Sequence, residues 1–374
     1  MLHCPTVVGG NPAGLAAAER ELGLASTAVV LEDSPFGYSV DQVVWDKGDG
    51  RLVRDLKRWP LLARAIRDYD VVHFNFGSTL MPQRVPTDAA GAGSPLMRAA
   101  RLRGVLLEQL DLRVLARAGK AIFVTFQGDD ARQGDVAARF RVNVPSEVPE
   151  GYYSPASDAD KRRRIARFDR YAHGIYALNP DLLHVLPERA RFVPYAHVDT
   201  RTWRPPSPAG GGERPLVLHA PTHRAVKGTR FLLAAVARLQ AEGVAFDFQL
   251  GEGLTQAQAR QLYERADIVV DQLLAGWYGG LAVEVMALER PVVTYLRKDD
   301  LDFVPPEMRA EIPVIEAEPA TIHGVLRELL TTRRDELSEI GGRGREYVRR
   351  WHDPLRIARE LVADYEAAVG RIRG

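Results

Sequence analysis

A basic loop in the second half of the chain has the residue types that bind an anion. Arg224, Lys227 and Gly228 follow the apolar run Leu216–His219 and precede an apolar helical pattern. Cations at a helix N-terminus oppose the helix dipole, and an anion bound between them and the helix removes this conflict. Arginine offers a fork of donors and lysine a point charge, so a phosphate or diphosphate suits the loop. A solvated basic loop is the alternative.

A second loop with chemical potential lies in the stretch Asp271–Leu296, whose pattern predicts a strand, a glycine turn, a helix and another strand. Gly279 and Gly280 allow the backbone to approach a ligand closely, and the first N–H groups of the helix lack partners within it. Glu284 lies one turn into this helix, where a carboxylate can simply stabilise the dipole by about 0.3–1 kcal/mol. Its neighbours are apolar, however, so the carboxylate needs a partner, and the two hydroxyls of a ribose would provide one.

A third loop follows the first expected strand, Thr6–Val8, and contains Gly9, Gly10 and Gly14 before a helical pattern. Backbone N–H groups at such a helix start suit a phosphate. The spacing departs from the dinucleotide-binding pattern G-x-G-x-x-G, so a tight strand-to-helix turn is the alternative.

These loops are positioned by short β-branched runs that alternate with amphipathic helical patterns. The expected strands are Thr6–Val8, Thr27–Leu31, Val71–Phe74, Ala121–Phe126, Gly174–Leu178, Phe192–Pro194, Leu216–His219, Ala245–Leu250, Ile268–Val270, Val292–Tyr295 and Ile312–Ile315. The expected helices include Ala13–Leu22, Ser94–Ala118, Pro180–Leu186, Arg230–Glu242, Thr255–Arg265, Ala282–Leu288 and Ala320–Thr332. This alternation predicts an α/β protein with doubly wound parallel sheets, in which ligands bind beyond the carboxyl ends of the strands.

The Pro- and Gly-rich segment His197–Pro215 is the best candidate for a linker between domains. The chain therefore divides into expected domains 1–197 and 198–352, followed by a helix over 353–374 with apolar residues at helical spacing. Gly91–Ser94 is a candidate acceptor-side lid.

Composition narrows the class of protein. The 374 residues are 46% hydrophobic and 26% charged, with a net charge of +1, which favours a globular protein and argues against nucleic-acid binding. The single cysteine, Cys4, excludes an internal disulfide and favours a reducing compartment. We find neither a leader-like segment nor a long apolar run, so the expected location is cytoplasmic.

Five segments together resemble the retaining glycosyltransferases of glycosyltransferase family 4, which have the GT-B fold. They are FVPYAHVDTRTWRP, THRAVKGT, ADIVVDQLLAGWYGGLAVEVMALERPVV, YDVVHFNFGST and IFVTFQGDDAR. The resemblance implies two Rossmann-like domains facing a cleft, with the C-terminal helix crossing back to the first domain. It also implies transfer of a sugar, with retention, from a nucleoside-diphosphate sugar to an acceptor hydroxyl, without a metal or other cofactor.

The resemblance assigns donor-site roles to individual residues. Arg224 and Lys227 would stabilise the leaving diphosphate, Glu284 would bind the ribose, and backbone N–H groups at Gly280–Leu281 would contact phosphate. The expected donor-binding residues are Gly10, Gly14, Arg224, Lys227, Gly251, Gly276, Tyr278, Gly279, Gly280, Leu281 and Glu284. Gly276 stands where the family has a sugar-facing Glu, and the loop Gly251–Thr255 is left to recognise the base, with UDP and GDP both open.

On the acceptor side, the expected residues are His73, Asn75, Gln127 and Arg132. Gln127 replaces a histidine of the family and cannot take a proton, whereas Asp129 and Asp130 can act as a base. The two aspartates are therefore candidate catalytic residues with Lys227 and Arg224. Alternatively, the aspartates cap the following helix, with Asp130 paired to Arg132, and His73 is satisfied within the fold.

Other functions remain open at this stage. A sugar-nucleotide epimerase of the same fold needs no separate acceptor, and a nucleotide-sugar-binding subunit would have weak or no catalysis. An NAD-linked oxidoreductase, suggested by Gly9–Gly14, leaves the basic loop and Glu284 unexplained. The acceptor is a small molecule, glycan or lipid-linked group. Membrane contact is at most peripheral, through the basic, apolar pattern Leu96–Lys120, which also suits an ordinary amphipathic helix. The oligomeric state is open.

Overall fold

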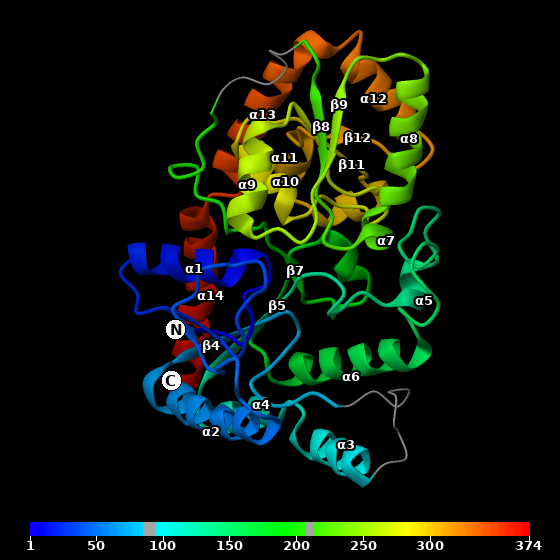
Figure 1. Cartoon of the computed structure of the whole chain (residues 1–374). Helices are drawn as coiled ribbons and strands as arrows, with labels where there is room; N and C mark the ends of the chain where they lie inside the picture. The colour runs from blue at the N-terminus through cyan, green and yellow to red at the C-terminus, as the bar shows by residue number, and fades with distance from the viewer. Residues whose placement is uncertain (85–94, 207–212) are drawn as a thin grey trace.

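The alternation of strands and helices builds two parallel sheets, one in each half of the chain (Figure 1). The computed structural model describes residues 1–84, 95–206 and 213–374. The candidate lid Gly91–Ser94 lies outside these ranges, and so does part of the linker His197–Pro215. The predicted fold class, two doubly wound α/β domains, is confirmed.

The N-terminal sheet has the strand order β3-β2-β1-β4-β5-β6-β7, and every pairing is parallel. Its strands are β1 Leu2–Cys4, β2 Thr27–Val30, β3 Gln42–Val43, β4 Val71–Asn75, β5 Ala121–Phe126, β6 Gly174–Ala177 and β7 Arg191–Phe192. Its helices are α1 Asn11–Glu21, α2 Arg51–Asp68, α3 Pro95–Leu107, α4 Leu110–Arg117, α5 Gly134–Ala137 and α6 Pro155–Tyr171, with 3-10 turns at Val8–Gly10 and Pro180–His184. The central strands β4 and β5 are wholly buried because helices cover both faces of the sheet.

The C-terminal sheet has the order β12-β11-β10-β8-β9, again all parallel. Its strands are β8 Leu216–His219, β9 Asp247–Leu250, β10 Ile268–Val270, β11 Val292–Thr294 and β12 Ile315–Glu316. Its helices are α7 Arg224–Lys227, α8 Thr229–Ala241, α9 Gln256–Arg265, α10 Gly280–Ala287, α11 Pro306–Ala310, α12 Ile322–Leu330 and α13 Leu337–Trp351, with 3-10 turns at Lys298–Phe303 and Arg334–Glu336. Both sheets direct the carboxyl ends of their strands toward the region between the domains, where loops of both halves line one cleft.

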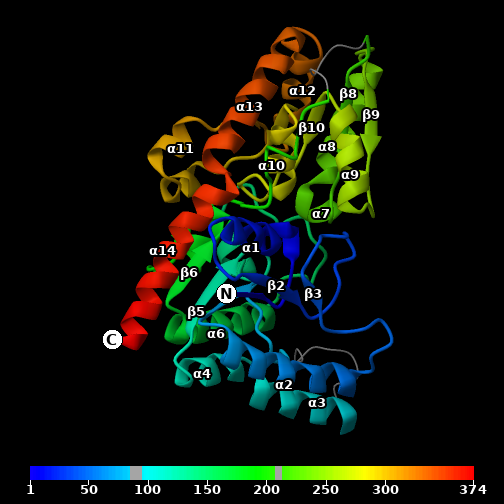
Figure 2. The ribbon, with the colours of Figure 1, turned by 90° about the vertical axis from the view of Figure 1, so that its left-hand side faces the viewer.

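The last helix, α14 (Pro354–Arg373), returns to the N-terminal domain as expected and lies beside α1 (Figures 1 and 2). Its buried residues Ile357, Leu361 and Tyr365 share a core cluster with Phe123 and Tyr176 of the N-terminal sheet. The helix therefore ties the end of the chain to the first domain by apolar burial.

Two expected elements are placed differently. The first strand is Leu2–Cys4, not Thr6–Val8, because Pro5 has no N–H to continue the ladder and residues 8–10 form a 3-10 turn. The expected helix Ser94–Ala118 breaks into α3 and α4 at Gln109, whose φ of 56° is left-handed.

Candidate active site

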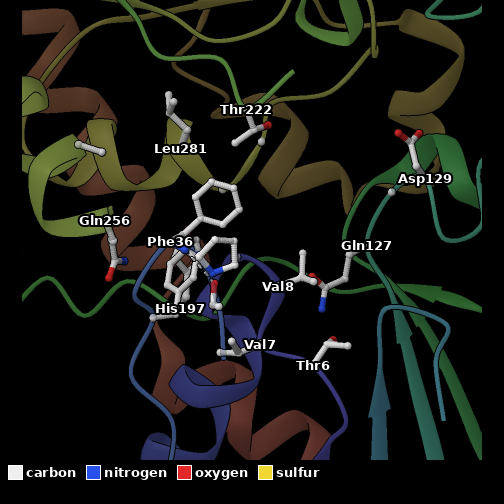
Figure 3. A pocket seen from close by; sticks show the side chains of 18 of the residues that line it. Thr6, Val7, Val8, Phe36, Gln127, Asp129, His197, Thr222, Gln256 and Leu281 are labelled. Carbon is white, nitrogen blue, oxygen red and sulfur yellow. Dashed lines mark hydrogen bonds between the residues drawn. The ribbon is translucent and has the colours of Figure 1, made fainter. Parts of the chain in front are cut away.

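A cleft of about 1080 Å³ lies between the two domains, at the carboxyl ends of both sheets. Loops that follow β1, β2, β4 and β5 line it from the N-terminal domain, and loops that follow β8, β9 and β10 line it from the C-terminal domain. Figure 3 shows side chains of both domains facing this space, with Gln256, Thr222 and Leu281 opposite Val7, Val8 and Gln127. A ligand that spans the two domains fits this position.

Lys227 reaches the cleft from the end of α7. Its ammonium lies 2.8 Å from Asp271 Oδ1 and 2.8 Å from Gln272 Oε1. The other oxygen of Asp271 accepts the N–H of Gly279 at 2.7 Å. A fully buried carboxylate thus orients both the cation and the glycine turn, and the lysine side chain keeps partial exposure toward the cleft.

The start of α10 also faces the cleft. Gly279, Gly280 and Leu281 line it, and the first N–H groups of a helix have no acceptor within the helix. A Cβ atom added at Gly280 would lie 3.2 Å from His197 Cε1, so the ring of His197 packs closely against this glycine. The arrangement places backbone donors beside the ammonium of Lys227, which together suit an anion.

Glu284 lines the same part of the cleft and is 3% exposed. Burial raises the pKa of its carboxyl group to about 7, although a hydrogen bond from Gln256 Nε2 (2.8 Å) and the charge of Arg260 oppose the rise. His197 Nε2 lies 3.6 Å from Glu284 Oε1, and burial lowers the pKa of this imidazole to about 4, so it is neutral near pH 7. The carboxylate therefore has few donors of its own and retains acceptor capacity for a ligand hydroxyl.

Several expected donor-site residues lie elsewhere. Arg224 is outside the cleft lining and pairs with Glu252, with Nε 2.7 Å from Oε1, so its fork of donors is already occupied. Tyr278 is buried, and its hydroxyl bonds Tyr347 and His352, both at 2.9 Å. Tyr278 thereby joins α13 to the glycine turn instead of facing a ligand.

The remaining glycines divide in the same way. Gly276 has a φ of 80°, and an added Cβ would lie 2.9 Å from Arg297 Cβ. The position that was expected to contact the donor sugar therefore packs against the Arg297 side chain and does not line the cleft. Gly10 packs under Tyr38, and Gly14 packs against the backbone of Ala196. Neither lines the cleft. Gly9, their neighbour, does line it, and so does Gly251.

On the N-terminal side, Asp129 lines the cleft but is occupied by donors. Arg132 NH1 lies 2.9 Å from its carboxylate, and the hydroxyls of Tyr152 and Tyr153 donate to it at 2.7 and 2.6 Å. Burial would raise its pKa, but the charge of Arg132 and the two hydroxyls outweigh burial and lower the pKa to about 2. At neutral pH Asp129 is therefore a charged acceptor, and its pKa is too low for a base tuned to that pH.

Asp130 turns away from the cleft lining and accepts the backbone N–H groups of Gln127 and Gly128, the latter at 2.6 Å. Burial raises its pKa to about 6, in spite of these bonds. Arg132 pairs with Asp129 and not with Asp130, so the expected Asp130–Arg132 pair is absent. Arg132 also bonds Asp181 at 2.7 Å.

Gln127 lines the cleft (Figure 3), and its buried Nε2 has no partner among the described residues. His73 and Asn75 do not reach the cleft. His73 is fully buried and bonds Tyr365 of α14 and Thr125 of β5, and the Asn75 amide bonds the His73 carbonyl at 3.2 Å. His73 is thus a structural residue that fastens α14 to the sheet.

The structure adds site residues that sequence reasoning did not single out. Gln272 lines the cleft, and Asp271 is buried beside it and holds Lys227 and Gly279 in place. Both directly follow β10, so their place at a strand end was a signal. His197 lies in the segment assigned to the linker, and Gln256 begins α9; neither has a local signature. The loop around Phe36 also crosses the cleft, since the carbonyl of Phe36 accepts the N–H of Gln256 at 2.8 Å.

No helix in residues 1–84, 95–206 and 213–374 is long and apolar enough to cross a membrane. In the same ranges, no group of three or more His, Cys, Asp or Glu side chains is placed to hold a metal ion.

Several solved structures of other proteins share the architecture of this chain. No protein-family model and no curated protein matches the chain. Among solved structures, HepE of Anabaena, in complex with UDP-glucose, superposes with a TM-score of 0.59 at 12% identity over 98% of each chain. Sucrose-phosphate synthase of Thermosynechococcus elongatus gives 0.61 at 14% identity, covering 99% of this chain and 98% of the other. The chain has the GT-B fold.

A third GT-B neighbour, MnaA of S. aureus with UDP, gives a TM-score of 0.51 at 13% identity and covers 99% and 96% of the two chains. At these identities, the likeness establishes the fold alone. The function has to come from the cleft.

Proposed function

We propose that the protein is a glycosyltransferase that moves a sugar from a nucleoside-diphosphate sugar to an acceptor hydroxyl, in the manner of glycosyltransferase family 4. The observation that carries this proposal is the convergence of Lys227, the first N–H groups of α10 and the buried Glu284 on one wall of the interdomain cleft. A cation and helix N–H groups suit a diphosphate, and a carboxylate with free acceptor capacity suits a ribose diol.

In this mechanism Lys227 and the N–H groups of Gly280 and Leu281 stabilise the negative charge that develops on the leaving diphosphate. Arg224 has no part in it unless it leaves Glu252. Asp129 and Gln127 face the cleft from the other domain and orient hydroxyl groups, Asp129 as an acceptor and Gln127 as a donor. A leaving-group oxygen takes the acceptor proton on the same face of the sugar, so the transfer retains the anomeric configuration and needs no metal.

The test begins with binding. Thermal unfolding of the whole chain is followed with UDP, GDP and ADP, because a ligand of the folded state raises its stability by mass action. The nucleotide that stabilises the chain determines which nucleotide sugars are tested as donors. Release of nucleoside diphosphate is then measured with a panel of acceptors, in the presence of a chelator because the proposed transfer needs no metal. NMR of the product anomeric proton tests retention. No stabilisation by any nucleoside diphosphate would refute the proposal.

A second candidate is a nucleotide-sugar-binding subunit without catalysis. It is favoured by one observation: neither Asp129, fixed by three donors, nor Asp130, turned toward its own backbone, is placed as a base. Stabilisation by a nucleotide sugar without turnover across the acceptor panel supports this candidate. Donor consumption without any acceptor points instead to an epimerase or hydrolase.

A further inference from the structure

A segment of the N-terminal domain crosses the cleft and contacts the C-terminal domain. It covers residues 33–38, between β2 and β3, and is called the strap. The N–H of Gln256, the first residue of α9, donates to the carbonyl of Phe36 at 2.8 Å. A Cβ atom added at Gly37 would lie 3.8 Å from Thr255 Cβ, an ordinary packing distance. The strap therefore rests on the N-terminus of α9, beside the loop that the sequence leaves for the nucleobase.

The strap is a tight turn that is held by its own hydrogen bonds. The N–H of Gly37 donates to the Ser34 carbonyl at 3.1 Å, and the N–H of Phe36 donates to the Ser34 hydroxyl at 3.2 Å. Gly37 has a φ of 70°, which glycine adopts without steric cost. The turn places Phe36 and Tyr38 along the cleft, with their ring centroids 6.5 Å apart. These bonds and the contact with α9 therefore fix two aromatic rings at this wall.

The two rings of the strap differ in depth. A Cβ atom added at Gly10 would lie 3.0 Å from Tyr38 Cδ1, so the Tyr38 ring packs on the start of α1. Burial and the charge of Glu284 raise the pKa of the Tyr38 hydroxyl, so this ring lies near the proposed ribose carboxylate. Phe36 is 39% exposed, and Figure 3 shows it facing the cleft, with Gln256 on the side of the C-terminal domain. Phe36 therefore has ring surface available for a ligand.

The C-terminal domain offers little ring surface of its own at this end of the cleft. Strand β9 ends at Leu250 and α9 begins at Gln256, so residues 251–255 alone connect them. This loop contains no aromatic residue. Tyr263 of α9 lines the cleft, but it is 4% exposed and packs in the core of the C-terminal domain. A base gains affinity by stacking on a planar side chain, and Phe36 has the exposed ring that the loop lacks.

A series of contacts orders this wall from the phosphate end to the strap. Lys227 and the start of α10 form the phosphate end, and Glu284 lies one turn further along α10. The Gln256 side chain bonds Glu284 at 2.8 Å, and the Gln256 backbone bonds Phe36 at 2.8 Å. Because the base is attached to the ribose, a nucleoside whose ribose hydroxyls contact Glu284 has its base beside Gln256 and Phe36.

We propose that Phe36 of the N-terminal domain stacks on the nucleobase of the donor, opposite the loop 251–255. This inference rests on the proposed function and adds the base-binding wall to it. Purines and pyrimidines both present a π-face, so stacking on Phe36 contributes to the affinity for every nucleoside diphosphate. Discrimination between bases is left to polar groups of the loop 251–255. The donor nucleoside is thus bound by both domains.

The test is isothermal titration calorimetry of the full chain with UDP, GDP and ADP, and the nucleotide that binds most tightly is used for the variants. Phe36→Ala should raise Kd at least about fivefold, because the stacking surface is lost. Phe36→Leu keeps an apolar side chain of similar bulk but has no π-face, so it should bind nearly as weakly as Phe36→Ala. Phe36→Tyr keeps the ring and should bind like the unmodified chain. A purely structural role of Phe36 in the strap would be met by leucine as well.

The matched control is Phe303→Ala, which removes a ring of similar exposure, 38%, that does not line the cleft. It should bind the nucleotide like the unmodified chain. An unchanged Kd in Phe36→Ala overturns the inference and leaves the proposed function standing, and so does tight binding by Phe36→Leu. A higher KM for the acceptor with an unchanged Kd for the nucleotide also overturns it, because the ring then belongs to the acceptor site. Absence of binding by the unmodified chain refutes the proposed function and this inference together.

Discussion

Replacing Glu284 by Gln should stabilise the fold and impair the site, with a pH dependence set by the pKa of the carboxyl group. Burial raises this pKa from 4.5 to about 7. Between these two values the folded chain holds a proton that the unfolded chain has lost, so the stability of the unmodified protein falls as pH rises through this window and is level above it. Glutamine carries no charge and shows no such loss.

The size of the effect follows from the same shift. At pH 8 the ionised Glu284 costs the folded state about 3 kcal/mol, since each pKa unit is worth about 1.4 kcal/mol. At pH 5 the cost is below about 1 kcal/mol. The free energy of unfolding of Glu284→Gln should therefore exceed that of the unmodified chain by a margin that grows by about 2.5 kcal/mol from pH 5 to pH 8.

Urea unfolding at pH 5, 6, 7 and 8 measures this margin through tryptophan fluorescence. Trp203, Trp277 and Trp351 pack in the same core cluster as α10, so they report on the domain that contains Glu284. Comparing the two proteins across pH cancels effects of the substitution on packing, which do not titrate. A margin that stays constant from pH 5 to pH 8 would refute the raised pKa.

Nucleotide binding is the second measurement on the same variant. A carboxylate that accepts ribose hydroxyls must be ionised, so affinity for the stabilising nucleoside diphosphate should rise with pH until about pH 7 and then level off. Glu284→Gln should bind about 10–100-fold more weakly at pH 8, because charge-assisted hydrogen bonds are lost, and its affinity should vary little with pH. Unchanged affinity in the variant would remove Glu284 from the donor site.

Three further substitutions test other parts of the site. Lys227→Met should lower the transfer rate at least about 100-fold and destabilise the chain by about 1–3 kcal/mol, because buried Asp271 loses its cation. The double variant Lys227→Met/Asp271→Asn should recover the free energy of unfolding, measured in urea, but not the transfer rate. A recovered rate in the double variant would exclude Lys227 from catalysis. Tyr278→Phe should cost about 1 kcal/mol through its lost hydrogen bonds and leave the nucleotide-induced thermal shift unchanged; a smaller shift would return Tyr278 to the donor site. Gly276→Ala should destabilise by at least about 1 kcal/mol, because φ is 80° and Arg297 adjoins the missing Cβ; an unchanged melting temperature would contradict this packing.

Local patterns in the sequence were sufficient for the architecture and for half of the donor wall. The β-branched runs at β8 and β10 have the predicted bounds, and the alternation of strands and helices predicts parallel sheets with a cleft at their carboxyl ends. Lys227 follows the end of β8, and Gly280 and Glu284 follow the end of β10, so each lies in a local strand–loop–helix unit. Their convergence could be predicted because parallel strands bring such loops to one edge.

Contacts between residues distant in the sequence were decided only by the tertiary structure. Arg224 was assigned to a phosphate, but Glu252, 28 residues further along the chain, lies within reach of it. His73 was placed near an acceptor, whereas α14 brings Tyr365 to it across 292 residues. Gly276 lost its expected role because Arg297 fills the space above it, and His197 joined the site because the linker passes the start of α10. Residue type and spacing specify what a side chain can bind, but packing of the folded chain determines which of the possible partners lies in contact with it.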